Sequence, residues 1–98
     1  MPFEVLPEKR AYADIQQAIS YYDSQQVGLG KKFLSAIEKH FDSLSKNPFF
    51  QIRYYNVRCL AVKKFPFMIH FILDEKTKKV YVISVLHTSQ DPNKWIEK

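Results

Sequence analysis

The sequence predicts an α+β fold in the order β-α-α-β-β-β, with a helical hairpin packed on a small, mostly antiparallel sheet. Three observations predict this class. A short alternating segment opens the chain, two amphipathic segments with helical spacing follow, and the second half holds alternating or continuously apolar segments typical of strands. The chain has 98 residues, so we expect one domain, residues 1–98.

Residues 3–6 predict the first strand. Apolar and polar side chains alternate there, and Pro2 and Pro7 flank the segment. Because proline has no backbone N–H to donate, we expect this strand at an edge of the sheet.

The first helix is predicted from Ala11 to Gln25 or Gln26. Its apolar residues recur at spacings of three and four, which is the period of a helix with one buried face: Tyr12, Ile15, Ile19 and Tyr22. Both glycines of the chain, Gly28 and Gly30, follow and predict a turn.

The second helix has the clearest pattern. Its apolar residues form one continuous face: Leu29, Phe33, Ile37, Phe41 and Leu44. Asn47 and Pro48 end the helix. Because only a few residues join the two helices, we expect them to pack as an antiparallel hairpin.

The remaining strands follow Pro48. Residues 57–65 alternate, which would place Arg58 and Lys64 on one strand face. Residues 67–73 and 80–86 are strongly apolar, and the charged residues 74–79 connect them as a hairpin. Such continuous apolar runs indicate central strands buried on both faces.

The net positive charge comes entirely from the second half of the chain. Residues 1–52 carry six Lys or Arg and six Asp or Glu, whereas residues 53–98 carry nine and four, which accounts for the net charge of +5. This asymmetry indicates a surface that meets polyanions. Apolar runs stay well short of the roughly 20 residues of a membrane span, and no leader pattern is visible, so we expect a cytoplasmic protein that does not enter a membrane.

Cysteine and histidine usage gives no support for a metal or cofactor site. The single Cys59 has no partner for a disulfide and is expected to be a buried strand residue. His40 and His70 are expected to be structural, because neither has an acidic residue at a sequence spacing that would indicate a site. We therefore expect no cofactor. The aromatic pairs at positions 49–50 and 54–55 are expected in the core rather than stacked on bases.

The order of the elements and the residues at their boundaries resemble those of the RelE/ParE toxin superfamily of bacterial type II toxin–antitoxin systems. The nearest likeness is to the ParE-like, plasmid-stabilisation branch. The residues that carry the resemblance are Asp14-Ile15, Tyr21-Tyr22, Gly28-Leu29-Gly30, Phe33, Asn47-Pro48, Val57-Arg58, Phe65-Pro66-Phe67, His87, Asp91-Pro92 and Trp95.

The resemblance implies a growth-arresting toxin that a cognate antitoxin neutralises. ParE-like members of the family poison DNA gyrase, and RelE-like members cleave messenger RNA on the ribosome. We expect the antitoxin to be acidic and partly disordered, and to order itself on binding. Its expected binding site is an apolar, incompletely covered groove between the helical hairpin and the sheet. Oligomeric state is left open.

His87, Arg58 and Lys64 are the candidate catalytic residues if the protein is a ribonuclease. Cleavage through the 2′-hydroxyl needs a base, an acid and a cation beside the phosphate. His87 can serve as acid or base, and the place of His87 and Arg58 resembles that of catalytic residues in RNA-cleaving members. Alternatively, His87 caps the turn at residues 88–92, Arg58 makes a structural ion pair with Asp74 or Asp91, and the Lys63-Lys64 pair is a solvated patch.

Two departures from the family pattern favour the interpretation that the protein is ParE-like. Gln90 stands where the family commonly has arginine, and no tyrosine follows Tyr81. We therefore predict a ParE-like toxin that binds a macromolecular target. A ribosome-dependent endoribonuclease and a non-toxic binding module remain the alternatives.

Overall fold

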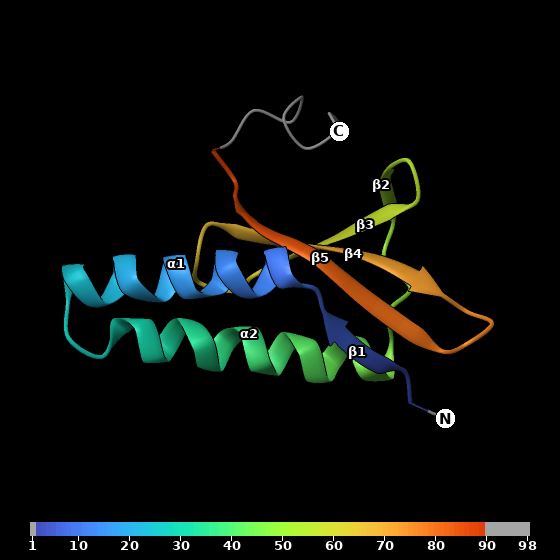
Figure 1. Ribbon diagram of the computed structural model, residues 1–98, viewed down its shortest axis with the longest axis horizontal. Helices are drawn as coiled ribbons and strands as arrows, with labels where there is room; N and C mark the ends of the chain where they lie inside the picture. The colour runs from blue at the N-terminus through green and yellow to red at the C-terminus, as the bar shows by residue number, and fades with distance from the viewer. Residues whose placement is uncertain (1, 90–98) are drawn as a thin grey trace.

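The computed structural model describes residues 2–89, and it confirms the predicted α+β class (Figure 1). Predictions that concern Gln90, Asp91, Pro92 and Trp95 lie outside the described residues. The elements in chain order are β1 (Glu4–Pro7), α1 (Lys9–Gln25), α2 (Leu29–Lys46), β2 (Ile52–Tyr54), β3 (Val57–Ala61), β4 (Phe67–Asp74) and β5 (Lys79–His87). Neither helix of residues 2–89 is long and apolar enough to cross a membrane.

The sheet has five strands in the order β1-β5-β4-β3-β2. β1 lies at one edge, as its flanking prolines predict, and pairs in parallel with β5. The other neighbouring strands pair antiparallel. The sequence did not reveal β2, because three residues are too few to show an alternating pattern.

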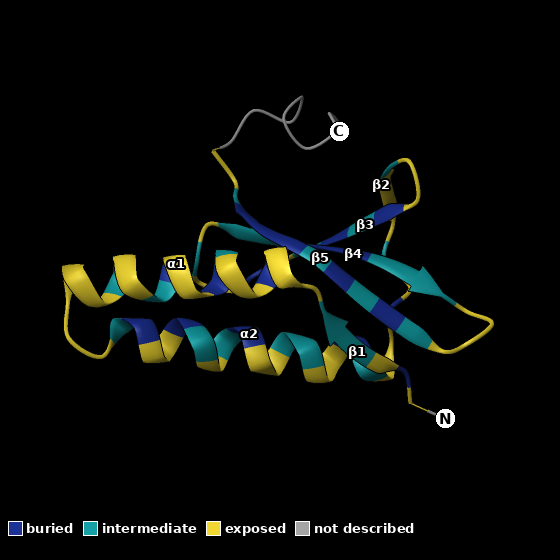
Figure 2. Ribbon diagram, in the orientation of Figure 1, coloured by how far each residue is buried: buried dark blue, intermediate teal, exposed yellow. Residues whose placement is uncertain are grey.

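The two helices pack antiparallel and place their apolar faces against the sheet (Figures 1 and 2). Phe33 of α2 is fully buried at the centre of this layer. Its ring lies 5.5 Å from that of Tyr22, 5.2 Å from Phe65 and 5.1 Å from Phe67, measured between centroids. This aromatic cluster joins both helices to the connection between β3 and β4.

Some aromatic residues predicted in the core are exposed instead. Tyr12 is 57% exposed, because the buried stripe of α1 runs through Ala11, Ile15 and Ala18 and leaves Tyr12 beside it. Phe49 is 56% exposed and Tyr55 is 75% exposed. The prediction that these three side chains are core residues is therefore wrong.

β3 is shorter than its alternating sequence predicts. The strand ends at Ala61, and the chain reverses before Phe67, whose carbonyl accepts a hydrogen bond from Val62 N–H at 2.9 Å. Lys64 lies in this turn with φ +73°, a left-handed conformation that lysine rarely adopts. The expectation that Lys64 shares a strand face with Arg58 is therefore wrong.

A buried polar cluster lies on the face of the sheet opposite to the core. His70 is fully buried, and its Nδ1 lies 3.0 Å from Tyr54 Oη and 3.4 Å from Cys59 Sγ. Burial, and to a smaller extent the positive charges of Arg10 and Arg53, lower the pKa of His70 to about 4. His70 is thus a neutral structural histidine at pH 7, and Cys59 is buried, as predicted.

Gly30→Ala should destabilise the protein. A Cβ at position 30 would lie 2.6 Å from the carbonyl oxygen of Ile19 and 2.8 Å from the carboxylate of Asp23 on α1. Such overpacking costs about 1–3 kcal/mol, which outweighs the gain of about 1 kcal/mol in helix propensity. Urea denaturation should show the loss. Gly28→Asn is the comparison that tests backbone strain without overpacking, because Gly28 has φ +88° and no neighbouring atom within 4 Å of an added Cβ. Equal stability of the alanine variant and wild type would contradict this packing.

Stability should fall as the pH drops below 6.5, because unfolded His70 then binds a proton that the folded protein excludes. For a folded pKa of about 4, the loss between pH 7 and pH 5 is about 2 kcal/mol. Denaturation curves at both pH values measure it. His70→Asn should flatten the pH dependence, and an unchanged slope would show that this imidazole is not the group responsible.

Candidate functional site

His87 lies at the end of β5 and lines a cavity of about 370 Å³ between this strand and α1. Its ring packs edge-on against Phe67 at 5.2 Å, and its Nδ1 accepts a hydrogen bond from Ser89 N–H at 3.0 Å. A neutral imidazole that accepts at Nδ1 carries its hydrogen on Nε2. The bond to Ser89 also agrees with the alternative that His87 caps the turn that follows.

Asp14 on α1 lines the same cavity. β1 ends at Pro7, so among residues 2–89 no strand continues along this edge of β5 beyond Val82. Asp14 Oδ2 accepts the N–H of Val85 there at 3.0 Å. Burial raises the pKa of Asp14, and the bond to Val85 and the charge of Arg10 offset only part of this effect. The sequence identified Asp14 only through family resemblance, since an acidic residue beside a buried stripe is not a signal by itself.

The Arg58 side chain is hydrogen-bonded to the protein backbone. Its Nη1 donates a hydrogen bond to the carbonyl oxygen of Phe50 at 2.7 Å, and Arg58 pairs across the sheet with Phe71. Among residues 2–89 it makes no ion pair with Asp74. The guanidinium therefore holds the segment between α2 and β2 against the sheet.

The three predicted catalytic residues do not converge on one point. His87 pairs with Phe67, and Arg58 pairs with Phe71 on the other side of β4. The two backbones are therefore about 13 Å apart along the strands, which is four residues. Across the sheet they are about 10 Å apart, which is two strand spacings. Lys64 lines a different cavity. Catalysis by this set stays a prediction, and the geometry does not favour a shared phosphate.

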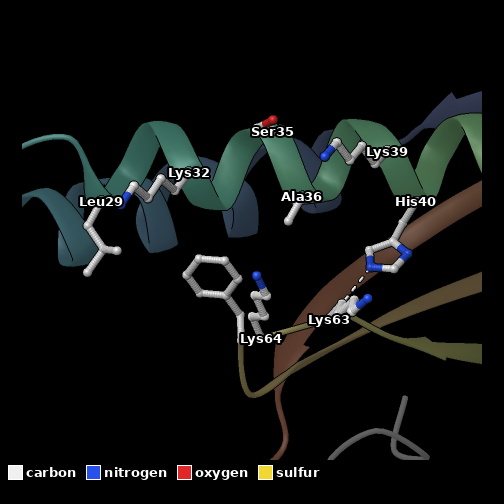
Figure 3. Close-up of a pocket in the computed structure, with 9 residues that line it drawn as sticks. Leu29, Lys32, Ser35, Ala36, Lys39, His40, Lys63 and Lys64 are labelled. Atoms are coloured by element: carbon white, nitrogen blue, oxygen red, sulfur yellow. Dashed lines mark hydrogen bonds between the residues drawn. The ribbon is translucent and has the colours of Figure 1, made fainter.

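A second cavity, about 670 Å³, lies between α2 and the turn that connects β3 to β4 (Figure 3). We call it the lysine groove. Four lysines form its rim: Lys32 and Lys39 from α2, Lys63 and Lys64 from the turn. Its floor is apolar and consists of Leu29, Ala36 and Phe65.

His40 fixes the turn against α2. Its Nε2 accepts a hydrogen bond from Lys63 N–H at 2.9 Å, which the dashed line in Figure 3 marks. Burial lowers the pKa of His40, and the charge of Lys63 lowers it further, so the ring remains an acceptor at neutral pH. His40 is thus structural, as predicted, but it also shapes the groove.

The charge of the groove is not compensated within the part of the chain that the structure describes. The ion pairs among residues 2–89 are Arg10 with Asp14 and Lys46 with Asp42, and neither includes a groove lysine. No three His, Cys, Asp or Glu side chains of that part lie where they could hold a metal ion. The arrangement can bind anionic groups through point charges and apolar groups through its floor.

Similar folds occur in solved structures of toxin–antitoxin systems. A structure of the chromosomal ParDE system from P. aeruginosa matches with a TM-score of 0.79 at 15% identity, covering 89% of this chain and 97% of that chain. A mutant of the E. coli toxin RelE in the free state matches with a TM-score of 0.68 at 13% identity, covering 91% of this chain and 86% of that chain. An archaeal RelE–RelB complex from Pyrococcus horikoshii matches with a TM-score of 0.60 at 13% identity, covering 93% of this chain and 100% of that chain.

No curated protein matches the sequence. A family model does: the ParE toxin of the type II toxin–antitoxin system parDE matches residues 5–92. These residues include both helices, strands β2 to β5 and all of β1 except Glu4. The family resemblance predicted from the sequence is confirmed, and the chain belongs to the ParE toxin family.

Proposed function

We propose that this protein is a ParE-like toxin that arrests growth by binding a macromolecular target and that a cognate antitoxin neutralises it. The family match over residues 5–92 supports the toxin part of the proposal. The separation of His87, Arg58 and Lys64 is the observation that supports binding rather than RNA cleavage. DNA gyrase is the target that the ParE-like resemblance implies, and the proposal places the protein in the bacterial cytoplasm with that target.

A RelE-like, ribosome-dependent endoribonuclease is the second candidate. The fold likeness to RelE structures supports it, as does the cavity that His87 shares with Asp14. An imidazole and a carboxyl group of raised pKa that line one cavity can serve as an acid–base pair. Cleavage would then use Asp14 and His87 beside α1, with Arg58 too distant to steady the same phosphate.

Expression of the protein without antitoxin should arrest growth, induce the SOS response and leave messenger RNA without new 5′ ends by primer extension. Binding of gyrase accounts for all three results, because stalled gyrase breaks DNA and spares RNA. His87→Ala should arrest growth as wild type does, since no proton transfer is involved.

The ribonuclease makes the opposite prediction for the same cells. New 5′ ends would appear without SOS induction, and His87→Ala would reduce cleavage by about 100-fold or more. Normal growth at high levels of folded wild-type protein would contradict both toxin functions and leave the non-toxic binding module.

A further inference from the structure

The lysine groove brings four ammonium groups to one concave site. Lys32 and Lys39 lie seven residues apart on α2, so their backbones are roughly 10 Å apart. Lys63 and Lys64 lie opposite them in the turn between β3 and β4 (Figure 3). No Asp or Glu is among the described residues that line the groove. Each ammonium ends a flexible stem, so the four charges can converge on one small ligand with several negative charges, which would relieve their repulsion.

The groove has the size of a small-molecule site, and it is preformed. Its volume of about 670 Å³ falls within the roughly 300–1,000 Å³ that is typical of such sites. The backbone N–H of Lys63 donates a hydrogen bond to His40 Nε2 at 2.9 Å, and the ring of Phe65 packs edge-on against buried Phe33 at 5.2 Å. These contacts hold the turn against α2, so a ligand that binds there spends little free energy on ordering the protein.

The floor of the groove requires an apolar part in the ligand. Leu29, Ala36 and Phe65 offer apolar surface beside the lysines. Inorganic phosphates alone would leave this surface exposed to water. Every nucleobase has a flat π-face that stacks on an aromatic side chain. A nucleoside that carries a chain of phosphates therefore matches the floor through its base and ribose, and the rim through its charge.

The groove fits one nucleotide better than a nucleic-acid strand. Sites for single strands place successive aromatic rings along a basic track, so that neighbouring bases stack in turn. Phe65 is the only Phe, Tyr or Trp among the described residues that line the groove. The exposed rings of Phe49 and Tyr55 belong to segments that do not line it. One stacking platform beside four positive charges favours a single base with several phosphates attached.

We propose that the lysine groove binds a nucleoside polyphosphate, with the base and ribose on the floor and the phosphates between the lysines of α2 and those of the turn. This inference goes beyond the proposed function and does not depend on it, because it rests on the shape and charge of the groove alone. Growth arrest by the wild-type protein is measured independently, so either claim can fail while the other holds. With such a ligand, occupancy of this face of α2 would follow the nucleotide level of the cell.

Two double variants with equal charge change test the inference. Lys32→Glu/Lys63→Glu reverses one charge on each side of the groove, and it leaves Lys64 in place because φ +73° makes that position sensitive to substitution. Lys31→Glu/Lys76→Glu is the matched control, since Lys31 is adjacent to Lys32 on α2, Lys76 lies in another turn, and neither lines the groove. All four substituted positions are exposed, so both variants should fold, which circular dichroism and thermal melts verify.

The measurement is calorimetric titration of the full-length protein with ATP and with GTP. At least one of them should bind the wild type, and that binding should weaken by at least about tenfold for the groove variant and by less than about threefold for the control. Tripolyphosphate should bind about fivefold more weakly than the nucleotide, or weaker still, because it has no base to stack on the floor. Absence of binding at millimolar nucleotide, equal weakening of both variants, or tripolyphosphate that binds as tightly as the nucleotide would each overturn the inference.

A further titration separates a nucleotide from a nucleic-acid strand. Fluorescence anisotropy with a labelled single-stranded RNA that lacks a 5′ phosphate should show no difference between the groove variant and the control. RNA that binds the wild type more tightly than the nucleotide does, and that loses this binding in the groove variant alone, would show that the groove serves a strand. The nucleotide inference would then fail.

Discussion

The aromatic cluster around Phe33 is the interaction on which the rest of the structure depends. Phe33 is fully buried, and it contacts Tyr22 from α1 and both Phe65 and Phe67 from the far end of the sheet. Burial of aromatic surface supplies much of the free energy that holds a small domain together. Because the cluster joins the helical hairpin to the turn between β3 and β4, it sets the width of the lysine groove.

The same packing separates the candidate functional features of the molecule. His87 and Asp14 lie beside α1, where β1 has ended and a carboxylate replaces the missing strand at Val85. The lysine groove lies beside α2. Arg58 faces the helical layer but is bound to the carbonyl of Phe50. A protein that acts by binding has use for several separate surfaces, whereas cleavage of RNA requires that acid, base and cation meet at one phosphate.

Periodicity in the sequence predicted most of the fold and little of the site. The helical spacing of Phe33 and Ile37 reflects burial of a whole face, so both helices were predictable. The alternation through Lys64 was misleading, since a tight turn can continue the pattern of a strand by chance. Tertiary contacts such as His40 with Lys63, or Asp14 with Val85, join residues 23 and 71 positions apart and leave no periodic signal. The lysine groove depends on the contact between His40 and Lys63. Sequence reasoning treated Lys64 as a candidate catalytic residue, or the Lys63-Lys64 pair as a solvated patch, and did not predict the groove.

The central claim is that this fold keeps His87, Arg58 and Lys64 apart on separate surfaces rather than gathering them at one catalytic point. A crystal structure of the protein tests the claim most directly. The account predicts that Arg58 Nη1 is bonded to the carbonyl of Phe50 and that His87 lies on the other side of β4. A structure in which these three side chains meet around one phosphate-sized site would contradict it.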